Sequence, residues 1–281
     1  MKQQTKSWLK PVLTAITICA FLALHPVHIN AQDSSNYFSV SYIKLKDPSN
    51  AQQYETDLID FNKKALEYRV KNNLISGWYL WKVVMPVGTS SEYDYVVVIS
   101  SKDIQVLLDD TTMAASFKAA YPDNTETLRQ SMTSTLNGMR AIVKREIYSN
   151  LAAFNDQGKM PAYVEVDYMK SAANKYNDYI KSEKETWMPV HKERMKLNVL
   201  AGWELDAKVL PASDNEQYDF VTANYFYTLS SMLDSKYTEA FKTVWPKSDI
   251  NVVFASTGSL RIMVRSDILK LVTYVDASNT K

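Results

Sequence analysis

Cysteine and histidine are scarce in this chain of 281 residues, and their scarcity excludes several kinds of site. Cys19 is the only cysteine, and His191 is the only histidine outside the first 31 residues. A zinc site needs several nitrogen or sulfur ligands, and a disulfide needs paired cysteines. The sequence therefore predicts no metal site, no cysteine nucleophile and no disulfide. A chain of this length can stabilise its fold through a hydrophobic core alone.

Glycine is also rare, with six residues in the whole chain. The glycine-rich motifs that hold nucleotide phosphates, G-x-x-x-x-G-K-[ST] and G-x-G-x-x-G, do not occur in the sequence. No G-x-S-x-G elbow presents a serine for a Ser-His-Asp triad. The sequence thus contains no diagnostic catalytic motif, and we expect no cofactor.

Long hydrophobic runs are absent except near the beginning of the chain. Three lysines and a charge-free apolar run over residues 12–24 precede the small residue Ala31, so residues 1–31 are typical of a signal peptide cleaved after Ala31. The run is shorter than the ~20 residues of a membrane span, and the large Ile18 before Cys19 argues against lipidation. We expect an exported protein, periplasmic or secreted; an uncleaved membrane anchor is the alternative.

A strong excess of one charge is absent too. The chain has 32 basic and 31 acidic residues, and three of the lysines lie within residues 1–31, so cleavage would change the net charge from +1 to −2. Nucleic acids require a positive footprint, and anionic membranes attract clusters of basic residues. We therefore expect a small-molecule ligand and neither nucleic acid nor membrane as a partner, with the oligomeric state left open.

The chain contains an internal duplication. The segment R-V-K-N-N-L-I-S-G-W from Arg69 matches R-M-K-L-N-V-L-A-G-W from Arg194, 125 residues later. Four further matches occur in the same order at nearly the same spacing: 37–44 with 163–170, 93–96 with 218–221, 117–122 with 241–246, and 139–147 with 260–268. Units of this length are too long for a solenoid repeat. We therefore expect two copies of one domain, over residues 32–156 and 157–281.

The sequence pattern of each copy predicts the element order β-α-β-β-α-β. In the second copy, residues 163–169 and 202–210 alternate between apolar and polar side chains, as half-buried strands do, while residues 174–197 have helical periodicity. A later helix is expected to run toward Arg265, before a β-rich segment over 268–275. The order predicts an α+β fold of two tandem ferredoxin-like units, packed as an intramolecular pseudo-dimer similar to an α+β barrel.

A long helix with the pattern W-x-P-x-H-x-x-R over residues 187–194, followed by Gly-Trp and a strand, resembles the dimeric α+β barrel superfamily. That superfamily includes antibiotic-biosynthesis-type monooxygenases, haem-degrading enzymes and many exported bacterial proteins without known function. The resemblance covers roughly residues 37–275 and rests on architecture and a loose pattern. It implies a ligand pocket between the sheet and its helices.

His191 is the first candidate for such a pocket. Trp187, His191 and Arg194 are four and three residues apart, so they share one face of the predicted helix. A histidine beside an arginine could act as a neutral base or bind an anionic group, and a single axial haem ligand is also conceivable. In the first copy the corresponding residue is Leu66, so a buried structural role is the alternative.

A second set of candidates lies on strand positions opposite the apolar residues. The second copy places four carboxylates there: Glu165, Asp167, Glu204 and Asp206. The first copy has Ser39, Ser41, Tyr79 and Trp81 at the matching positions. If the two sheets face each other, this interior could bind a cation or a polar ligand, and mutual repulsion would raise carboxylate pKa values. A solvated sheet face is the alternative.

These observations favour an exported protein that binds a small molecule under the first helix of the second copy. One alternative is a cofactor-free monooxygenase- or isomerase-like enzyme that uses His191 and Arg194. Another is a structural or interaction module without a pocket. Trp81 is the aromatic candidate, because Asp206 stands at its place in the second copy.

Overall fold

The computed structural model describes residues 36–86, 91–109, 111–123, 126–156, 159–213 and 215–280. The expected signal peptide lies outside these residues. The first copy of the repeat forms the elements β1 (Tyr37–Leu45), η1 (Pro48–Asn50), α1 (Ala51–Asp57), η2 (Leu58–Asn62), α2 (Lys63–Lys71), β2 (Gly77–Met85), β3 (Tyr95–Ser101), α3 (Ile104–Leu108), α4 (Thr111–Ala120), α5 (Glu126–Met139) and β4 (Arg140–Asn155).

The second copy repeats this order except for η1, which has no counterpart there. Its elements are β5 (Tyr163–Ser171), α6 (Tyr176–Ser182), η3 (Glu183–Trp187), α7 (Met188–Lys196), β6 (Gly202–Leu210), β7 (Phe220–Phe226), α8 (Leu229–Leu233), α9 (Tyr237–Val244), α10 (Ile250–Leu260) and β8 (Arg261–Asp276). Both η2 and η3 are single π-helical turns inside a long helix. Because this widened turn occurs in both copies, it is a feature of the shared architecture.

The eight strands form one closed, antiparallel barrel in the order β1-β3-β2-β8-β5-β7-β6-β4. Each copy contributes four neighbouring strands, with the order β4-β1-β3-β2 in the first and β8-β5-β7-β6 in the second. That is the strand order of a ferredoxin-like unit. The prediction of two tandem ferredoxin-like units in a barrel-like pseudo-dimer is confirmed.

Two long strands close the barrel by pairing with both copies. The first part of β4 pairs with β1, and its end, from Ile147 to Asn155, pairs with β6. The strand β8 does the same, pairing first with β5 and then, from Ile268 to Asp276, with β2. A closed barrel leaves no unpaired sheet edge. The division into separate domains at residues 156 and 157 stays a prediction.

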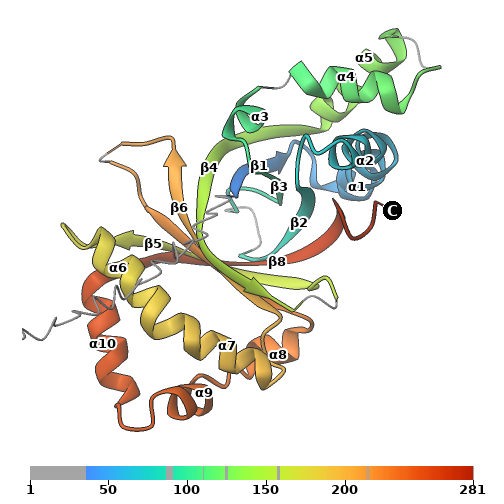
Figure 1. The fold of residues 1–281 in the computed structure, drawn as a ribbon. Helices are drawn as coiled ribbons and strands as arrows, with labels where there is room; N and C mark the ends of the chain where they lie inside the picture. Colours follow the sequence, from blue (N-terminus) through green and yellow to red (C-terminus); the bar gives the residue numbers. More distant parts are fainter. Residues whose placement is uncertain are drawn as a thin grey trace, which may run out of the picture. The chain divides into compact units, whose positions relative to one another are not determined.

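The helices cover the outer face of the barrel in two groups. Figure 1 shows α1, α2 and α4 on one side and α6, α7, α9 and α10 on another. Beneath the first group lies a hydrophobic cluster that includes Leu58, Phe61 and Leu66. The barrel interior holds a further cluster, rich in tyrosine and valine. Both faces of the strands are therefore buried, one by helices and one by the opposite wall of the barrel.

The end of each first helix is built in the same way. Asn73 and Asn198 adopt the left-handed conformation, with φ of 55° and 58°, just after α2 and α7. Asparagine tolerates this conformation better than most residues, so it ends helices where the chain must turn sharply. Gly202 then begins β6, where a Cβ atom would come within 3.1 Å of the Phe154 carbonyl oxygen on the neighbouring strand.

One predicted boundary was wrong. Helix α10 ends at Leu260 and β8 begins at Arg261, whereas helix was expected to run toward Arg265. Residues Arg261 to Lys270 pair with β5 along its whole length. The hydrogen bonds of this distant ladder override the local helical pattern, which is the usual way in which tertiary contacts displace a propensity.

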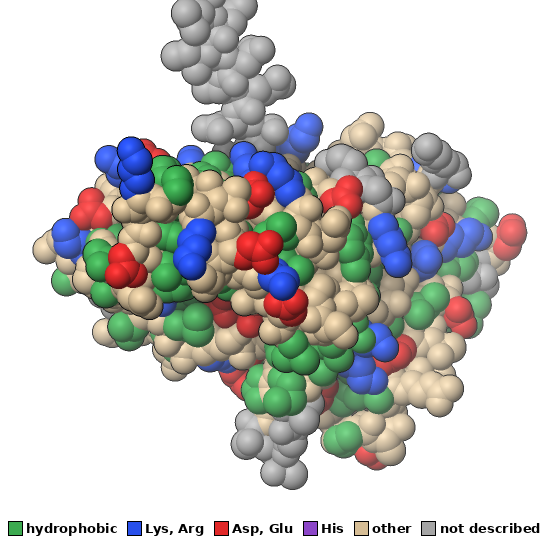
Figure 2. Space-filling model, turned by 90° about the horizontal axis from the view of Figure 1, so that it is seen from below, with side chains coloured by type: hydrophobic (Ala, Val, Ile, Leu, Met, Phe, Trp, Pro, Cys, Tyr) green, Lys and Arg blue, Asp and Glu red, His purple; other side chains and the backbone are tan. Residues whose placement is uncertain are grey.

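The surface is mixed in charge. On the face shown in Figure 2, basic and acidic side chains are interspersed, without a large patch of either sign. Within the part of the chain that the structure describes, no helix combines the length and the apolar character needed to cross a membrane.

Candidate functional site

The strands send the predicted acidic residues to two different places. Glu165 and Asp167 on β5 point outward, into a cavity beneath the helices. Glu204 and Asp206 on β6 point into the barrel. The hypothesis that all four carboxylates share one interior was therefore wrong for the β5 pair. Both faces of each strand are buried, so alternation alone could not show which face is the interior.

The first cavity, here called the helix–sheet cavity, has a volume of about 300 Å³. It lies between the outer face of the second copy's strands and the helical elements η3, α7, α9 and α10. The aromatic side chains that line it are Trp187, Trp203, Tyr237 and Phe254. The ionisable side chains that line it are Glu165, Asp167, Glu183, His191 and Arg261. Four of the candidates predicted from the sequence, Trp187, His191, Glu165 and Asp167, thus line one cavity.

His191 is held rigidly in this cavity and is only 4% exposed. Its ring stacks on Trp203 with 5.2 Å between ring centroids. The Arg194 guanidinium nitrogen Nη1 lies 3.0 Å from His191 Nδ1. Arginine can only donate, so Nδ1 accepts and we assign the proton of the neutral ring to Nε2. Burial, with a smaller contribution from Arg194, holds the pKa of His191 well below its usual value.

Arg194 connects α7 to the rest of the site without lining the cavity itself. It donates from Nε to the Ser235 carbonyl oxygen at 2.7 Å and from Nη1 to Asn224 Oδ1 at 3.3 Å. Its guanidinium carbon lies 3.9 Å from the centre of the Tyr237 ring. These contacts fix the position of the cation and, through it, the orientation of His191.

Burial raises the pKa values of the carboxyl groups that line the helix–sheet cavity. Burial, with repulsion from Asp167, raises the pKa of Glu165 to about 7. Burial likewise raises the pKa of Glu183 to about 7, although Arg261 opposes the shift. The pKa of Asp167 is also raised, chiefly by burial. Glu183 is 5% exposed, and its carboxyl forms no ion pair with any described residue.

Arg261 is the second cation of the cavity. Its Nε atom is buried and has no hydrogen-bond partner among the described residues. The Nε atom of its first-copy counterpart Arg140 is unpartnered too, so this feature belongs to the repeat, and only in the second copy does the arginine line a cavity where a ligand could contact it. Neither Arg261 nor Glu183 was among the candidates selected from the sequence. The signal for Glu183 was its counterpart Leu58, since the two residues differ at equivalent positions of the repeat.

The residues present do not fit a haem iron bound through His191. A histidine that ligates a metal through one ring nitrogen almost always donates a hydrogen bond from the other. Here the second nitrogen, Nδ1, faces the Arg194 guanidinium, which leaves it only the role of acceptor. The remaining nitrogen Nε2 then carries the proton and has no lone pair for a metal.

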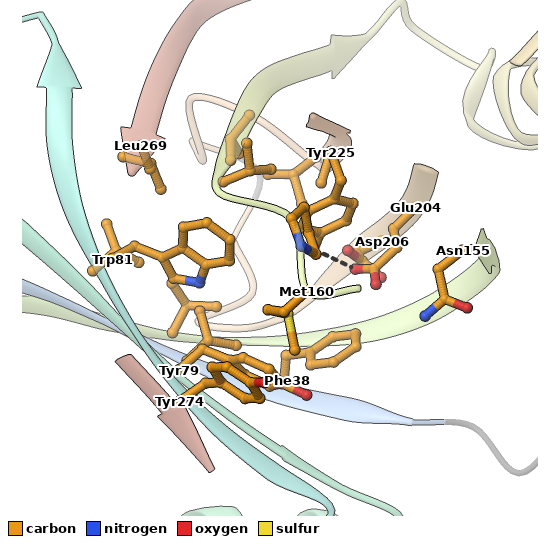
Figure 3. Close-up of a pocket in the computed structure, with 18 of the residues that line it drawn as sticks. Phe38, Tyr79, Trp81, Asn155, Met160, Glu204, Asp206, Tyr225, Leu269 and Tyr274 are labelled. Carbon is orange, nitrogen blue, oxygen red and sulfur yellow. Dashed lines mark hydrogen bonds between the residues drawn. The ribbon is translucent and has the colours of Figure 1, made fainter. Parts of the chain in front are cut away.

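The second cavity, here called the barrel cavity, has a volume of about 540 Å³ and lies inside the barrel. Figure 3 shows Tyr79, Trp81 and Tyr274 on one side of it, with Glu204 and Asp206 across from them. Strands β2 and β6 occupy equivalent places in the two copies, so the aromatic pair on β2 and the acidic pair on β6 are counterparts. Trp81 and Glu204 thus lie in a different cavity from His191.

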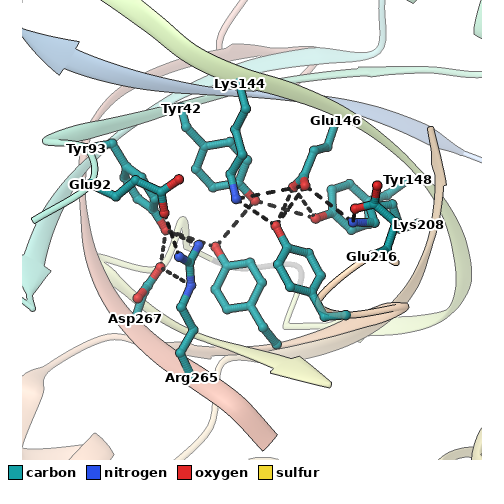
Figure 4. Close-up of polar contacts among 12 residues, drawn as sticks. Tyr42, Glu92, Tyr93, Lys144, Glu146, Tyr148, Lys208, Glu216, Arg265 and Asp267 are labelled. Atoms are coloured by element: carbon teal, nitrogen blue, oxygen red, sulfur yellow. Dashed lines mark hydrogen bonds and ion pairs between the residues drawn. The ribbon is translucent and has the colours of Figure 1, made fainter. Parts of the chain in front are cut away.

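A network of tyrosines and ion pairs fills the barrel at the inner end of this cavity (Figure 4). It has the symmetry of the repeat. Tyr218 donates to Glu146 at 2.8 Å and accepts from Lys144 at 2.9 Å. In the other half, Tyr93 donates to Asp267 and accepts from Arg265, the latter at 2.8 Å. Because nearly all of these groups satisfy one another, the network is a structural plug.

Comparisons with known proteins concern the fold. No protein-family model and no curated protein matches the sequence. A Fusobacterium nucleatum protein named "Putative monooxygenase" matches the structure with a TM-score of 0.54 and 7% identity over 86% of this chain and 95% of that one. An anthrone oxidase-like protein matches with a TM-score of 0.50 and 7% identity over 89% and 96%.

The chain has the dimeric α+β barrel fold. A protein named "Putative Chlorite dismutase" is a further structural match, with a TM-score of 0.47 and 12% identity over 88% of this chain and 97% of that one. The resemblance stated from the sequence is confirmed at the level of the fold. At these identities the likeness extends to the fold and no further, because one fold supports many functions.

Proposed function

We propose that the protein binds a small polar molecule in the helix–sheet cavity of its second copy. One observation carries the proposal. Where the second copy places Glu183, His191 and Asn224 between helix and sheet, the first copy has Leu58, Leu66 and Ile99 in a single hydrophobic cluster. The same architecture is therefore built with apolar residues at these three positions, which supports a functional role for the polar residues of the second copy.

The physical cost of the polar interface supports this interpretation. Burying a carboxyl or an imidazole without full hydrogen bonding costs free energy, and buried charges are often no better for stability than apolar residues of similar size. The Nε atom of Arg261 has no hydrogen-bond partner in the described structure, and Glu183 lines the same cavity without a salt bridge to a described residue. A ligand with both hydrogen-bond donors and an acidic group would satisfy them.

The volume and the lining indicate the kind of ligand. A cavity of about 300 Å³ is at the lower end of the range for small-molecule sites, ≈ 300–1,000 Å³. Trp187 and Phe254, whose ring centroids are 4.7 Å apart, offer flat apolar surface, and the acids and Arg261 offer polar contacts. We expect a compact molecule with a planar part and groups of both polarities.

Enzymatic proton transfer is the second candidate. A general base works best when its pKa lies near the working pH, and the pKa of Glu165 is about 7. His191 would then serve as a hydrogen-bond donor through Nε2, and not as the base that the sequence suggested. This version makes Glu165 the proton acceptor for a substrate held beside it.

The test compares the purified protein with a variant that carries first-copy residues in the cavity, Glu183→Leu combined with His191→Leu. Native mass spectrometry looks for a co-purifying small molecule, and thermal shift with a metabolite panel looks for stabilisation. We expect the wild type to show a ligand by one of these methods and the variant to lose it. Lys192→Leu, an exposed change on the same helix, is the matched control and keeps the ligand.

Two outcomes would contradict the proposal. If the double variant retains the bound molecule, the ligand lies elsewhere. If neither method finds any ligand for the folded wild type, the structural or interaction-module alternative is favoured. If the Glu165→Gln variant still binds the ligand but no longer converts it, the protein is an enzyme and not only a binding protein.

Export through residues 1–31 belongs to the proposal, and the N-terminal sequence of the mature protein tests it.

A further inference from the structure

The barrel cavity is larger than the helix–sheet cavity and is independent of it. At about 540 Å³ it is large enough for a whole small molecule. The exposed residues Asp156, Lys159 and Ser278 line one end, where the cavity reaches the surface. Tyr42, Tyr148 and Tyr168 of the polar network line the other end. The cavity thus opens to the surface at the end lined by these exposed residues, and strands of both copies build it.

One wall of the pocket is acidic and lacks a cation. Asp206 is 5% exposed and accepts one hydrogen bond, from Asn150 Nδ2 at 2.7 Å. Glu204 accepts one, from the Tyr225 hydroxyl at 3.1 Å. No lysine or arginine in the described ranges pairs with either carboxyl. A carboxylate offers about four acceptor sites, so most of the acceptor capacity of this pair is unused.

The cation that might have neutralised the pair is engaged elsewhere. Lys208 follows Asp206 on the same face of β6, but its ammonium pairs with Glu216 and with Glu146, the latter at 3.5 Å. Around the entrance, the lining contains one cation, Lys159, and two further acids, Asp156 and Asp276. The charged groups that line the pocket therefore sum to a negative interior.

The opposite wall is aromatic. The Tyr79 and Tyr274 rings are nearly parallel at 6.4 Å, and the Trp81 ring centroid lies 6.2 Å from that of Tyr225, which adjoins the acidic wall. Phe38 adds a further ring to the lining. Such walls bind the hydrocarbon part of a ligand, and their faces attract a positive charge. An acidic wall facing an aromatic one selects a molecule with a cationic end and an apolar body.

We propose that the barrel cavity binds a primary amine with an apolar or aromatic body. The ammonium group, with its three donors, lies against Glu204 and Asp206, and the body lies among Phe38, Tyr79 and Trp81. The site is distinct from the helix–sheet cavity, so this proposal is tested independently of the function proposed above.

The ionisation of the acidic pair makes binding depend on pH. Burial raises the pKa of Glu204 to about 7, and burial together with repulsion from Glu204 raises that of Asp206. A cation binds the ionised carboxylates, so the affinity rises as the pH rises through 7 and protons are released on binding. An aliphatic amine stays protonated over this range, as lysine does.

Calorimetric titration with 2-phenylethylamine and its neutral analogue 2-phenylethanol tests the proposal. At pH 8 we expect the amine to bind wild type at least tenfold more tightly than the alcohol, and at pH 6 the ratio falls. The variant Glu204→Gln/Asp206→Asn preserves the shape of the wall, and we expect it to bind the amine no more tightly than the alcohol. The matched variant Glu165→Gln/Asp167→Asn, in the helix–sheet cavity, keeps it. Thermal unfolding confirms that both variants are folded.

Three results would overturn the proposal. The first is that the amine binds wild type no more tightly than the alcohol at pH 8. The second is that the preference for the amine survives in the Glu204→Gln/Asp206→Asn variant. Alternatively, the Glu165→Gln/Asp167→Asn variant removes it, which would place the ammonium group in the helix–sheet cavity. If the Glu204→Gln/Asp206→Asn variant does not fold, the pH dependence and the buffer-dependent heat of proton release on the wild type decide in its place.

Discussion

The two copies of the repeat share one backbone plan and differ in what lies between helix and sheet. In the first copy, Leu58, Leu66 and Ile99 pack in an apolar cluster. In the second, Glu183, His191 and Asn224 stand at the equivalent positions around a cavity. Arg69 and Arg194 occur at the same helical position in both. The difference teaches that these three positions can be apolar in a stable interface, so the polar residues that occupy them in the second copy are candidates for function.

The arginine shows how an architectural residue can take on a new contact. Arg69 donates to Thr112 in the first copy, whereas Arg194 contacts His191, Asn224 and Tyr237 in the second. The helix C-terminus favours a cation in both cases.

The largest effect on stability is expected when the glutamate of the second copy is introduced at the equivalent position of the first copy. Leu58→Glu places a carboxyl in the hydrophobic cluster of the first copy, where no cavity or ligand compensates. We expect the free energy of unfolding at pH 8 to fall by about 3 kcal/mol or more, measured by urea denaturation. Leu58→Met, which preserves the apolar volume, is the control. A loss as small as that of the control would show that the two interfaces are interchangeable.

The reverse change is expected to stabilise the protein in a pH-dependent way. The pKa of Glu183 is about 7 and an unfolded glutamate titrates near 4.3, so the folded state holds an extra proton between these values. Stability from this group therefore falls as the pH rises from about 4.5 to 7. Glu183→Leu removes that loss, and we expect it to be more stable than wild type at pH 8 by about 1–3 kcal/mol.

The comparison of wild type and Glu183→Leu at two pH values checks this prediction. Urea denaturation at pH 5 and pH 8 gives the difference in unfolding free energy at each. The advantage of the variant is expected to be smaller at pH 5, where the wild-type carboxyl is protonated. A variant that is less stable than wild type at both pH values would mean that Glu183 has a structural role.

The smallest effect concerns a single proton. Because burial and Arg194 hold the pKa of His191 well below its usual value, we expect its ring to stay neutral at pH 5.5 with the proton on Nε2. Nitrogen NMR of the histidine ring in the mature protein measures both properties. Titration of His191 near pH 6.5, or a proton on Nδ1, would contradict the assigned contact with Arg194 and reopen the question of a metal ligand.

Much of the fold could be predicted from the sequence because the same patterns mark the helices and strands in both copies of the repeat. The match of Arg69 with Arg194, followed in each copy by Gly-Trp, marked the helix end and strand start twice. The end of α10 could not be predicted, since residues 261–265 take their strand conformation from pairing with β5. Local sequence carries no information on which distant strand supplies the hydrogen bonds.

For the candidate site, the sequence singled out His191, Trp187 and the four carboxylates but could not assign them to cavities. A strand places alternate residues on opposite faces, and that rule held for β5 and β6. In β5 the apolar residues Val164 and Val166 face the interior, whereas in β6 the acids Glu204 and Asp206 do. Polarity does not identify the inner face when both faces are buried.

By itself the sequence determined the duplication, the order of the elements and the positions where the two copies differ, because these follow from local periodicity and from comparing the chain with itself. Only the tertiary structure decided which of those positions meet. Closure of the barrel brings β6 opposite β2 and separates Glu204 from Glu165. The physical reason is that strand register and closure depend on contacts between residues far apart in the chain, such as those that pair β4 with β6 and β2 with β8.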